Sequence, residues 1–293
     1  MRWDVDWGIV QAGGPTSYNW AGVDRVAATA AKFGIKSLPI ITYAPQWAFD
    51  PVFKCASYQH CEPLDPNAFA RFAGEVVKRY KDSIHVWEIW NEQNLSVFWA
   101  PRSNCQKYTA LLKASYTAIK QVDPSATVLA GGFAPAATDG TNMAPIDYLK
   151  CIYAEGGKGY FDAVAHHPYT YPYSPSTPGG NAWAQMSLTS TSLRSLMVLN
   201  GDGDKKIWMT EFGAPTGGPD SRWYVSEAMQ ASIIKEALQL HATYPWAGPI
   251  FIYSLRDSGT TSETNENFFG IMRRDWTRKP AYDTMKTIIS SGI

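Results

Sequence analysis

The sequence predicts an α/β protein whose parallel strands form a (β/α)8 barrel of the TIM type. Three observations lead to this fold class. Short β-rich runs alternate with amphipathic helical runs along the chain, which favours a parallel sheet. No glycine-rich nucleotide loop follows a strand, which argues against a dinucleotide-binding fold. Polar residues also gather where several β-rich runs end, and a β/α barrel builds its active site at that rim.

Seven β-rich runs are the expected strands. They cover Arg2–Trp7, Ser37–Thr42, Ile84–Trp90, Thr127–Gly131, Phe161–His166, Lys206–Glu211 and Pro249–Ser254. A standard barrel has eight strands, and the first of these seven begins at residue 2. We therefore expect a barrel that lacks or shortens its first strand at the N-terminus.

The clearest helix is expected from Pro66 to about Tyr80, where apolar residues recur at helical spacing. Asp65 can cap this helix, and a proline suits the first helical position. Other helices are expected at Val23–Phe33, Tyr108–Val122, Pro145–Glu155, Ala182–Leu199, Ser221–Thr243 and Arg278–Ile289. No low-complexity linker divides the chain, so residues 1–293 are expected to form a single domain.

The composition excludes some classes of partner. Lys and Arg total 26, as do Asp and Glu, so neither nucleic acid nor an anionic membrane is expected as a partner. No window has the length and apolarity of a membrane span. The 12 Trp and 16 Tyr either fill the core or form platforms on which sugar rings stack, and composition leaves both interpretations open.

The four cysteines predict disulfides more readily than a metal site. Cys55 and Cys61 have the spacing of a short loop disulfide, which leaves Cys105 and Cys151 as a possible second pair. A Cys/His metal site lacks any CxxC spacing and has only five histidines to draw on. An even count favours an oxidising compartment, extracellular or periplasmic. The N-terminus does not resemble a signal peptide, so either a leader has been removed or this location is wrong.

Two glutamates close apolar strand-like runs. Glu92 ends the run that begins at His85, and Glu211 ends the run that begins at Lys206. Burying a carboxylate among apolar residues costs free energy, so a glutamate in such a position suggests a functional role. Paired carboxylates at strand ends are typical of glycoside hydrolysis, in which one donates a proton and the other lies on the opposite face of the sugar.

The residues around both glutamates resemble those of clan A glycoside hydrolases. Trp90–Asn94 (Trp-Asn-Glu-Gln-Asn) is similar to the clan's acid/base segment, with Gln93 where proline is usual. Thr210–Gly213 is similar to the end of its nucleophile strand. Further likenesses cover Arg2–Asp4, Ala165–Tyr169 and Phe269–Tyr282. The resemblance is closest to families 39 and 5, and it spans nearly the whole chain apart from the absent first strand.

The resemblance implies roles for matching residues. Glu92 would be the acid/base and Glu211 the nucleophile. Asn91 would bind the sugar 2-hydroxyl, and Arg2 would keep Glu211 ionised. Tyr253 stands where the clan often has tryptophan beneath the sugar. The full set of expected substrate-binding residues is Asn91, Arg2, Trp47, Tyr43, His167, Tyr169 and Tyr253.

Several polar residues have structural alternatives. If Glu92 points into the barrel, strand alternation turns Glu88 inward too. We favour a structural ion pair for Glu88, with Arg2 as a candidate partner, over a catalytic role. Asp4 and Asp6 are expected in a polar network inside the barrel. His166 is as easily a core histidine, and Trp47 could equally pack its own loop.

The sequence thus predicts a retaining glycoside hydrolase that cleaves β-glycosidic bonds of an oligo- or polysaccharide, as a monomer without metal or organic cofactor. A transglycosidase would use the same residues, and a carbohydrate-binding barrel without turnover is a further alternative. A metal-dependent hydrolase is disfavoured because the chain has few histidines.

Overall fold

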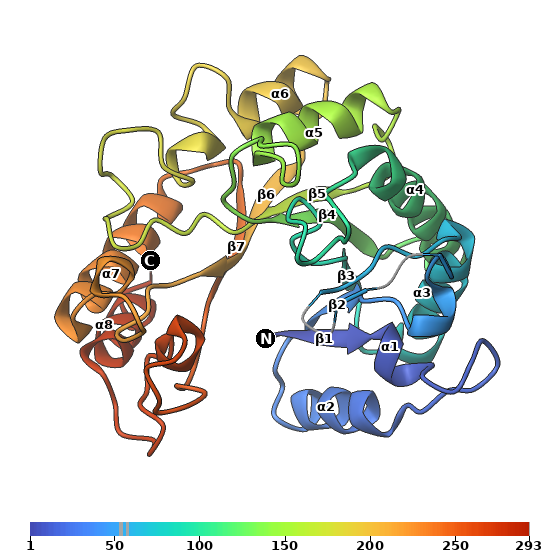
Figure 1. Cartoon of the computed structure of the whole chain (residues 1–293). Coiled ribbons are helices and arrows are strands. Elements are labelled where there is room, and N and C mark those ends of the chain that lie inside the picture. Colours follow the sequence, from blue (N-terminus) through green and yellow to red (C-terminus); the bar gives the residue numbers. More distant parts are fainter. Residues whose placement is uncertain (53–54, 57–58, 293) are drawn as a thin grey trace. The chain divides into compact units, whose positions relative to one another are not determined.

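A computed structural model describes residues 1–52, 55–56 and 59–292 (Figure 1). Its parallel strands alternate with helices and follow chain order. The seven strands are β1 (Arg2–Asp6), β2 (Leu38–Thr42), β3 (Val86–Ile89), β4 (Thr127–Phe133), β5 (Ala163–His166), β6 (Lys206–Phe212) and β7 (Ala247–Ile252). Each overlaps one predicted strand. The described part of the chain is therefore a β/α barrel fold with a missing or shortened first strand, as predicted.

The helices also match the predicted runs, with local differences. They are α1 (Trp7–Val10), α2 (Ala21–Lys32), α3 (Pro66–Tyr80), α4 (Cys105–Val122), α5 (Pro145–Ala154), α6 (Leu193–Leu199), α7 (Glu227–Ala242) and α8 (Pro280–Ser290). Helix α3 begins as expected: the Asp65 side chain accepts a hydrogen bond from the Asn67 amide, and Pro66 follows the cap. Helix α1 was not predicted, because four residues carry too little periodicity.

Two predicted helices are shorter than their apolar patterns. The run 182–199 divides into a 3-10 turn at Ala184–Met186 and helix α6. Ser192, just before α6, and Ser195, in its first turn, bond each other's amide and hydroxyl groups, a local pattern that starts the helix there. In the run 221–243, the Ser226 hydroxyl accepts from the Met229 amide and starts α7 there.

Residue contacts group the chain into two compact units. The first holds Met1–Ala165 and Leu196–Lys205, and the second holds His166–Ser195 and the chain from Lys206 onward. A single domain over residues 1–293 stays a prediction. In the described part of the chain, no helix combines the length and the apolarity that crossing a bilayer requires.

The first unit contains a parallel sheet in which β1 pairs with β2, β2 with β3, and β3 with β4. Every residue of β2 is buried, as expected for a strand covered on both faces. Helices α3 and α4 lie side by side against these strands (Figure 1). Buried tryptophans fill much of the core; those fully buried in the two units are Trp7, Trp87, Trp90, Trp99 and Trp183. For these five, the core interpretation is the correct one.

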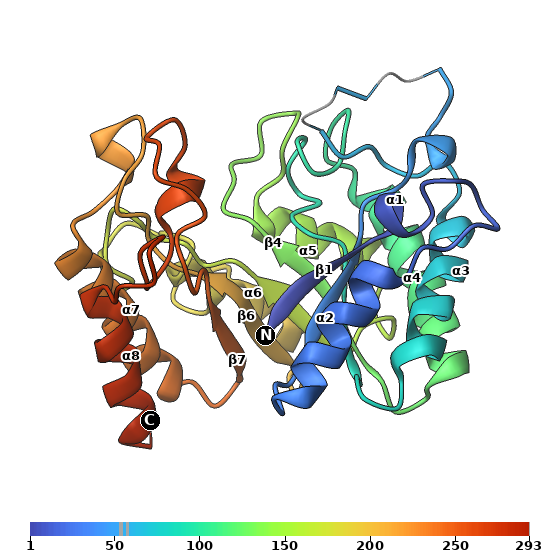
Figure 2. The same ribbon diagram turned by 90° about the horizontal axis from the view of Figure 1, so that it is seen from below.

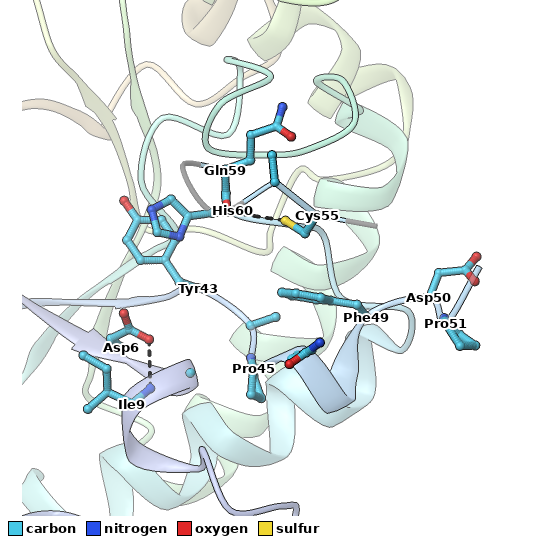
Figure 3. Close-up of a pocket in the computed structure, with 14 residues that line it drawn as sticks. Asp6, Ile9, Tyr43, Pro45, Phe49, Asp50, Pro51, Cys55, Gln59 and His60 are labelled. Atoms are coloured by element: carbon cyan, nitrogen blue, oxygen red, sulfur yellow. Dashed lines mark hydrogen bonds between the residues drawn. The ribbon is translucent and has the colours of Figure 1, made fainter. Parts of the chain in front are cut away.

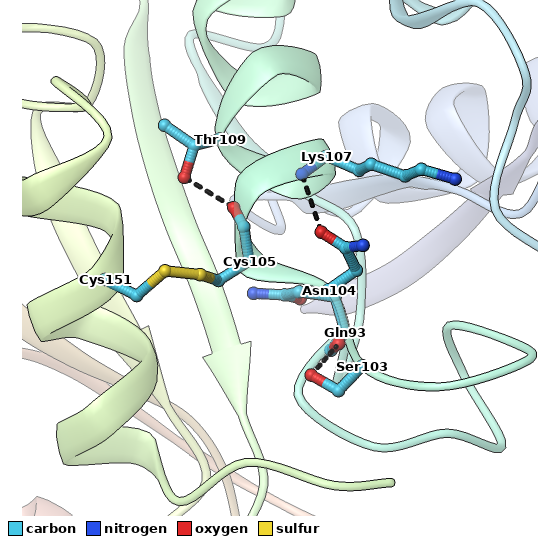
Figure 4. The surroundings of a disulfide bond; sticks show 7 residues. All are labelled: Gln93, Ser103, Asn104, Cys105, Lys107, Thr109 and Cys151. Atoms are coloured by element: carbon cyan, nitrogen blue, oxygen red, sulfur yellow. Dashed lines mark hydrogen bonds between the residues drawn. A yellow bond between two sulfur atoms is a disulfide. The ribbon is translucent and has the colours of Figure 1, made fainter. Parts of the chain in front are cut away.

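The expected Cys55–Cys61 disulfide forms, the pairing of Cys105 with Cys151 that was left open is also present, and both lie in the first unit. Cys55 and Cys61 have Cα atoms 5.8 Å apart, and Cys105 and Cys151 have Cα atoms 6.3 Å apart. The second disulfide joins the first residue of α4 to α5 (Figure 4). The first closes a loop of the segment between β2 and α3.

The second unit pairs β6 with β7 in parallel, and α7 and α8 pack side by side (Figure 2). Its loop after β7 is held by a buried ion pair, in which the Lys279 ammonium lies 2.8 Å from Asp257 Oδ1. The same Asp257 oxygen accepts from the Gly270 amide, and Lys279 also donates to Thr216. Burial lowers the pKa of Lys279, while Asp257 acts in the opposite direction.

Candidate active site

The backbone around Glu92 is held in an uncommon conformation. Strand β3 ends at Ile89, after which Trp90 and Glu92 have φ angles of 68° and 50°. Residues other than glycine rarely adopt this left-handed region, and such strain gathers at functional sites. Hydrogen bonds to both neighbouring strands fix the turn: the Trp90 amide donates to Ile41, and the Glu92 amide donates to Gly132. The half-buried Glu92 thus follows the carboxyl end of β3 directly.

The other members of the Trp90–Asn94 segment stabilise this turn. The buried Trp90 indole donates to the Phe98 carbonyl at 2.8 Å. The buried Asn94 carboxamide donates to the carbonyls of Ala134 and Met143 and accepts from the Ala134 amide. These bonds occupy the Asn94 side chain inside the fold, so its Asn-Leu-Ser sequence does not present a glycosylation acceptor at the surface.

A buried ion pair orients the residue before Glu92. The Arg2 guanidinium pairs with Glu88 through contacts of 2.8 Å and 3.1 Å, which confirms the predicted pair. Arg2 Nη2 also donates to Asn91 Oδ1 at 2.7 Å, and Asn91 Nδ2 donates to the Tyr43 hydroxyl at 3.2 Å. Asn91 is therefore fixed from both ends of its carboxamide. The role of Arg2 toward Glu211 stays a prediction.

Tyr43 lies at the end of β2 in the same kind of backbone conformation, with a φ of 54°. Its ring stacks on His60, with centroids 3.5 Å apart and planes 11° apart. Burial raises the pKa of the Tyr43 hydroxyl well above its usual range and lowers the pKa of His60. At neutral pH the hydroxyl therefore keeps its proton, and the His60 ring is neutral.

A cavity of about 850 Å³ opens beside Tyr43 (Figure 3). Its wall includes Asp6, which sequence reasoning had assigned to a polar network inside the barrel. Asp6 instead caps α1 by accepting from the Ile9 amide at 3.1 Å. Burial raises the pKa of Asp6 to about 6, against the opposing effect of backbone hydrogen bonds from Ile9 and Gly8.

Trp47 lies in the segment after β2 but is not among the residues that line this cavity. Its indole nitrogen donates to the Gln11 carbonyl at 2.7 Å, and its ring meets Trp7 edge to face. The side chain is 38% exposed. These contacts favour the interpretation that Trp47 packs its own loop. A sugar-binding role for Trp47 stays a prediction.

In the second unit, Glu211 lies one residue before the end of β6, and its partners come from the segment after β5. The Tyr169 hydroxyl donates to Glu211 Oε2 at 2.7 Å, and His167 Nδ1 lies 3.7 Å from the same oxygen. The Glu211 side chain is 17% exposed and His167 is fully buried. His166, by contrast, bonds the Ala182 carbonyl inside the fold, which makes it a core histidine.

Tyr253 directly follows β7, and its amide donates to Phe212 of the neighbouring strand. Its ring packs against Phe269, with centroids 5.2 Å apart. The Tyr253 hydroxyl donates to Glu266 Oε2 at 3.0 Å. Gly213 passes so close to the Tyr253 carbonyl that a β-carbon there would clash, which explains the glycine after Glu211 and Phe212.

Sequence reasoning missed three residues near these sites, namely His60, Phe49 and Glu266. All three lie in connecting segments, where no strand periodicity marks them. Glu266 belongs to no recognisable sequence motif, and only its hydrogen bond with Tyr253 places it near the site. His60 precedes Cys61, so the disulfide was the one available signal that its loop is held in place.

No protein-family model matches the chain. Its structure is similar to a family 39 glycoside hydrolase from the gut symbiont Bacteroides cellulosilyticus WH2, with a TM-score of 0.74 and 23% identity over 96% of this chain and 56% of that one. It is also similar to a monomeric beta-xylosidase from Caulobacter crescentus CB15, with a TM-score of 0.69 and 17% identity over 93% of this chain and 57% of that one. The chain thus spans little more than half the length of these two proteins.

Native xylanase 10B from Thermotoga maritima is similar along most of its own length. The TM-score is 0.64 and the identity 14%, over 98% of this chain and 84% of that one. Identities this low show the fold alone. The predicted likeness to clan A glycoside hydrolases is confirmed at that level: the chain has their β/α barrel fold.

Proposed function

We propose that the chain is a retaining glycoside hydrolase that cleaves β-glycosidic bonds of an oligo- or polysaccharide by double displacement. One observation carries the proposal: each of two strand-end carboxylates has a polar partner fixed beside it. Asn91 is held next to Glu92, and the Tyr169 hydroxyl bonds Glu211. The fold shared with known glycoside hydrolases supports the same class of reaction.

In the first step, the Glu211 carboxylate attacks the anomeric carbon. The bond from that carbon to the leaving oxygen breaks, and the Glu92 carboxyl group gives its proton to that oxygen. A glycosyl ester on Glu211 results. This step requires the two carboxyl groups to lie on opposite sides of the sugar, about 5–5.5 Å apart.

In the second step, water attacks the same carbon and the ester bond to Glu211 breaks. Glu92, now a carboxylate, takes the proton from water, and the released sugar keeps its original anomeric configuration. Glu92 therefore needs two protonation states in one cycle. In the structure Glu92 is half-buried.

The neighbouring residues have supporting roles in this proposal. Asn91 would bind the sugar 2-hydroxyl, and its fixed carboxamide limits the reorganisation needed when that bond strengthens in the transition state. Tyr169 donates to Glu211 Oε2 and would orient this carboxylate toward the anomeric carbon. His167 and Tyr253 are further sugar-binding residues in this proposal.

The similar structures suggest the substrate class. Their names describe enzymes of β-xylosides, xylan and β-1,4-galactan. We propose a β-linked chain of such sugars as substrate, with no metal or organic cofactor and with the enzyme acting as a monomer. The two disulfides favour an extracellular or periplasmic location.

Trapping the covalent intermediate tests this proposal. Incubation with activated 2-deoxy-2-fluoro β-glycosides of xylose, glucose and galactose should inactivate the enzyme and add one glycosyl mass to the peptide that contains Glu211. The same experiment on Glu211→Gln should give no labelled peptide. A label on another residue would exclude Glu211 as nucleophile. Products formed with and without added acceptor sugars separate a hydrolase from a transglycosidase.

A further inference from the structure

We propose that the cavity beside Tyr43 binds a second sugar unit of the substrate, on the glycone side of the cleaved bond. The enzyme would then act on chains of at least two β-linked sugars ahead of the scissile bond, in preference to single glycosides. This inference rests on the proposed function and adds a specificity site to it.

The cavity wall combines an aromatic ring with polar groups. Phe49 is half-buried and lines the space, where its ring lies between Pro45 and Cys55 (Figure 3). Asp6 and His60 line the same cavity. A pyranose has two apolar C–H faces and a rim of hydroxyl groups, so it needs both kinds of surface. The volume of about 850 Å³ lies within the range of small-molecule sites.

Asp6 and His60 suit neutral hydroxyl groups. The pKa of Asp6, raised to about 6 by burial, lets its carboxyl group accept hydrogen bonds when ionised and also donate one when protonated. The lowered pKa of His60 leaves an imidazole with one donor and one acceptor. Both side chains can therefore match a sugar hydroxyl, which is donor and acceptor at once.

Tyr43 connects the cavity to the proposed reaction site. Its ring lines the cavity, and its hydroxyl accepts from Asn91. In the proposed function Asn91 binds the 2-hydroxyl of the sugar that is attacked, which lies on the glycone side. A sugar unit in the cavity would therefore extend the glycone, and Tyr43 would lie between the two units.

His60 is held in the cavity wall by backbone bonds. Its amide donates to Val97 and its carbonyl accepts from the Ala100 amide, both in the segment after Glu92. The next residue, Cys61, forms the disulfide with Cys55. A side chain whose backbone is held in this way loses less conformational entropy on binding, which favours affinity for a small neutral ligand.

The test compares p-nitrophenyl β-biosides with the matching monosides, for xylose, glucose and galactose. For the preferred sugar, we expect the wild-type kcat/KM to be at least about tenfold higher for the bioside, as one additional aromatic contact can supply. Phe49→Ala should lower the ratio of bioside to monoside kcat/KM by about tenfold. Phe49→Tyr should retain the ratio, because it keeps the aromatic face.

Phe33→Ala is the matched control, since Phe33 is 68% exposed at the end of α2 and does not line the cavity. This variant should leave the ratio at the wild-type value. A wild-type ratio near one, with turnover of monosides, would overturn the cavity assignment while leaving the proposed function intact. A ratio that Phe49→Ala and Phe33→Ala change equally would overturn it as well.

Calorimetric titration gives a readout that needs no turnover. Xylobiose, cellobiose and galactobiose are titrated into wild type, Phe49→Ala and Phe33→Ala. We expect one disaccharide to bind wild type and Phe33→Ala alike, and Phe49→Ala at least about fivefold more weakly. If binding follows this pattern but no glycoside is cleaved, the proposed hydrolysis fails and the cavity is a sugar-binding site without a glycone side. No binding of any disaccharide to wild type would exclude the cavity assignment.

Discussion

The two candidate catalytic glutamates are held by different means. Glu92 lies in a turn with two left-handed φ angles, beside an asparagine that Arg2 and Tyr43 fix. Glu211 lies near the end of a strand, where the Tyr169 hydroxyl donates to its carboxylate and His167 lies 3.7 Å from the same oxygen. A proton-transferring group must change its charge during the cycle, whereas a nucleophile must carry a negative charge when it attacks. A hydroxyl that donates to the Glu211 carboxylate suits the proposed nucleophile.

We expect the loss of the proposed nucleophile to have the largest effect on activity. A small effect would contradict the proposed difference between the two glutamates. Glu211→Gln is expected to lower kcat by more than about 10⁴-fold, because no covalent intermediate can form. Its matched control is Glu263→Gln, an exposed glutamate of the same unit, which should keep full activity. Circular dichroism should be the same for both variants. Near wild-type turnover in Glu211→Gln would contradict the assignment.

Glu92→Gln should cost less, about 10²- to 10⁴-fold, because the loss concerns proton transfer alone. The loss should shrink when the leaving group is activated, since dinitrophenolate departs without a proton. Added azide distinguishes the two proposed roles, because it can replace the missing group as a nucleophile. On an activated substrate, Glu92→Ala should form a glycosyl azide with retained anomeric configuration, and Glu211→Ala should form one with inverted configuration. NMR of the glycosyl azides reads the configuration, and the same configuration from both variants would refute the two-role model.

The buried ion pair of each unit offers a stability comparison. Arg2→Met removes the cation that pairs with the fully buried Glu88, and Lys279→Met does the same to Asp257. Each should lower the free energy of unfolding by about 3–5 kcal/mol, because a buried carboxylate loses its counter-charge. Urea denaturation measures this, with exposed Lys81→Met as the control. Arg2→Met should also lower activity in the folded enzyme, since Asn91 loses one of its two anchors.

The smallest predicted effect concerns Asp6 and depends on pH. Its pKa in the folded chain, about 6, is raised from 3.8, so the folded state favours the protonated form. Stability is therefore lost as pH rises from about 4 to 6. The full shift corresponds to about 3 kcal/mol, which partial exposure reduces to about 1–2 kcal/mol.

Asp6→Asn removes this titration and keeps a good helix cap. Relative to wild type, the variant should gain little at pH 4 and about 1–2 kcal/mol above pH 6. Urea unfolding at pH 4, 5, 6 and 7 measures the difference, and exposed Asp82→Asn should show none of this pH dependence. A stability difference that is constant with pH would show that burial does not shift the Asp6 titration.

The sequence alone determined the features that depend on neighbouring residues. Alternation gave the seven strands, and helical spacing with Asp65 and Pro66 gave α3 to the residue. Strand alternation from Glu92 also predicted that Glu88 would turn inward to Arg2, because side chains two and four residues apart share a face. The loop spacing of Cys55 and Cys61 was enough for their disulfide.

Only the tertiary structure decided which distant side chains meet. Tyr43 stacks on His60 and bonds Asn91, a contact between residues 48 positions apart. The left-handed turn at Glu92 is stabilised by Gly132 of the next strand. Asp6 lines a cavity because the segment after β2 folds beside it. Such contacts depend on the paths of loops and on backbone angles. The helical or strand periodicity of apolar residues in the sequence does not encode either of these. The sequence therefore determined the strands and the two glutamates, and tertiary packing decided their partners.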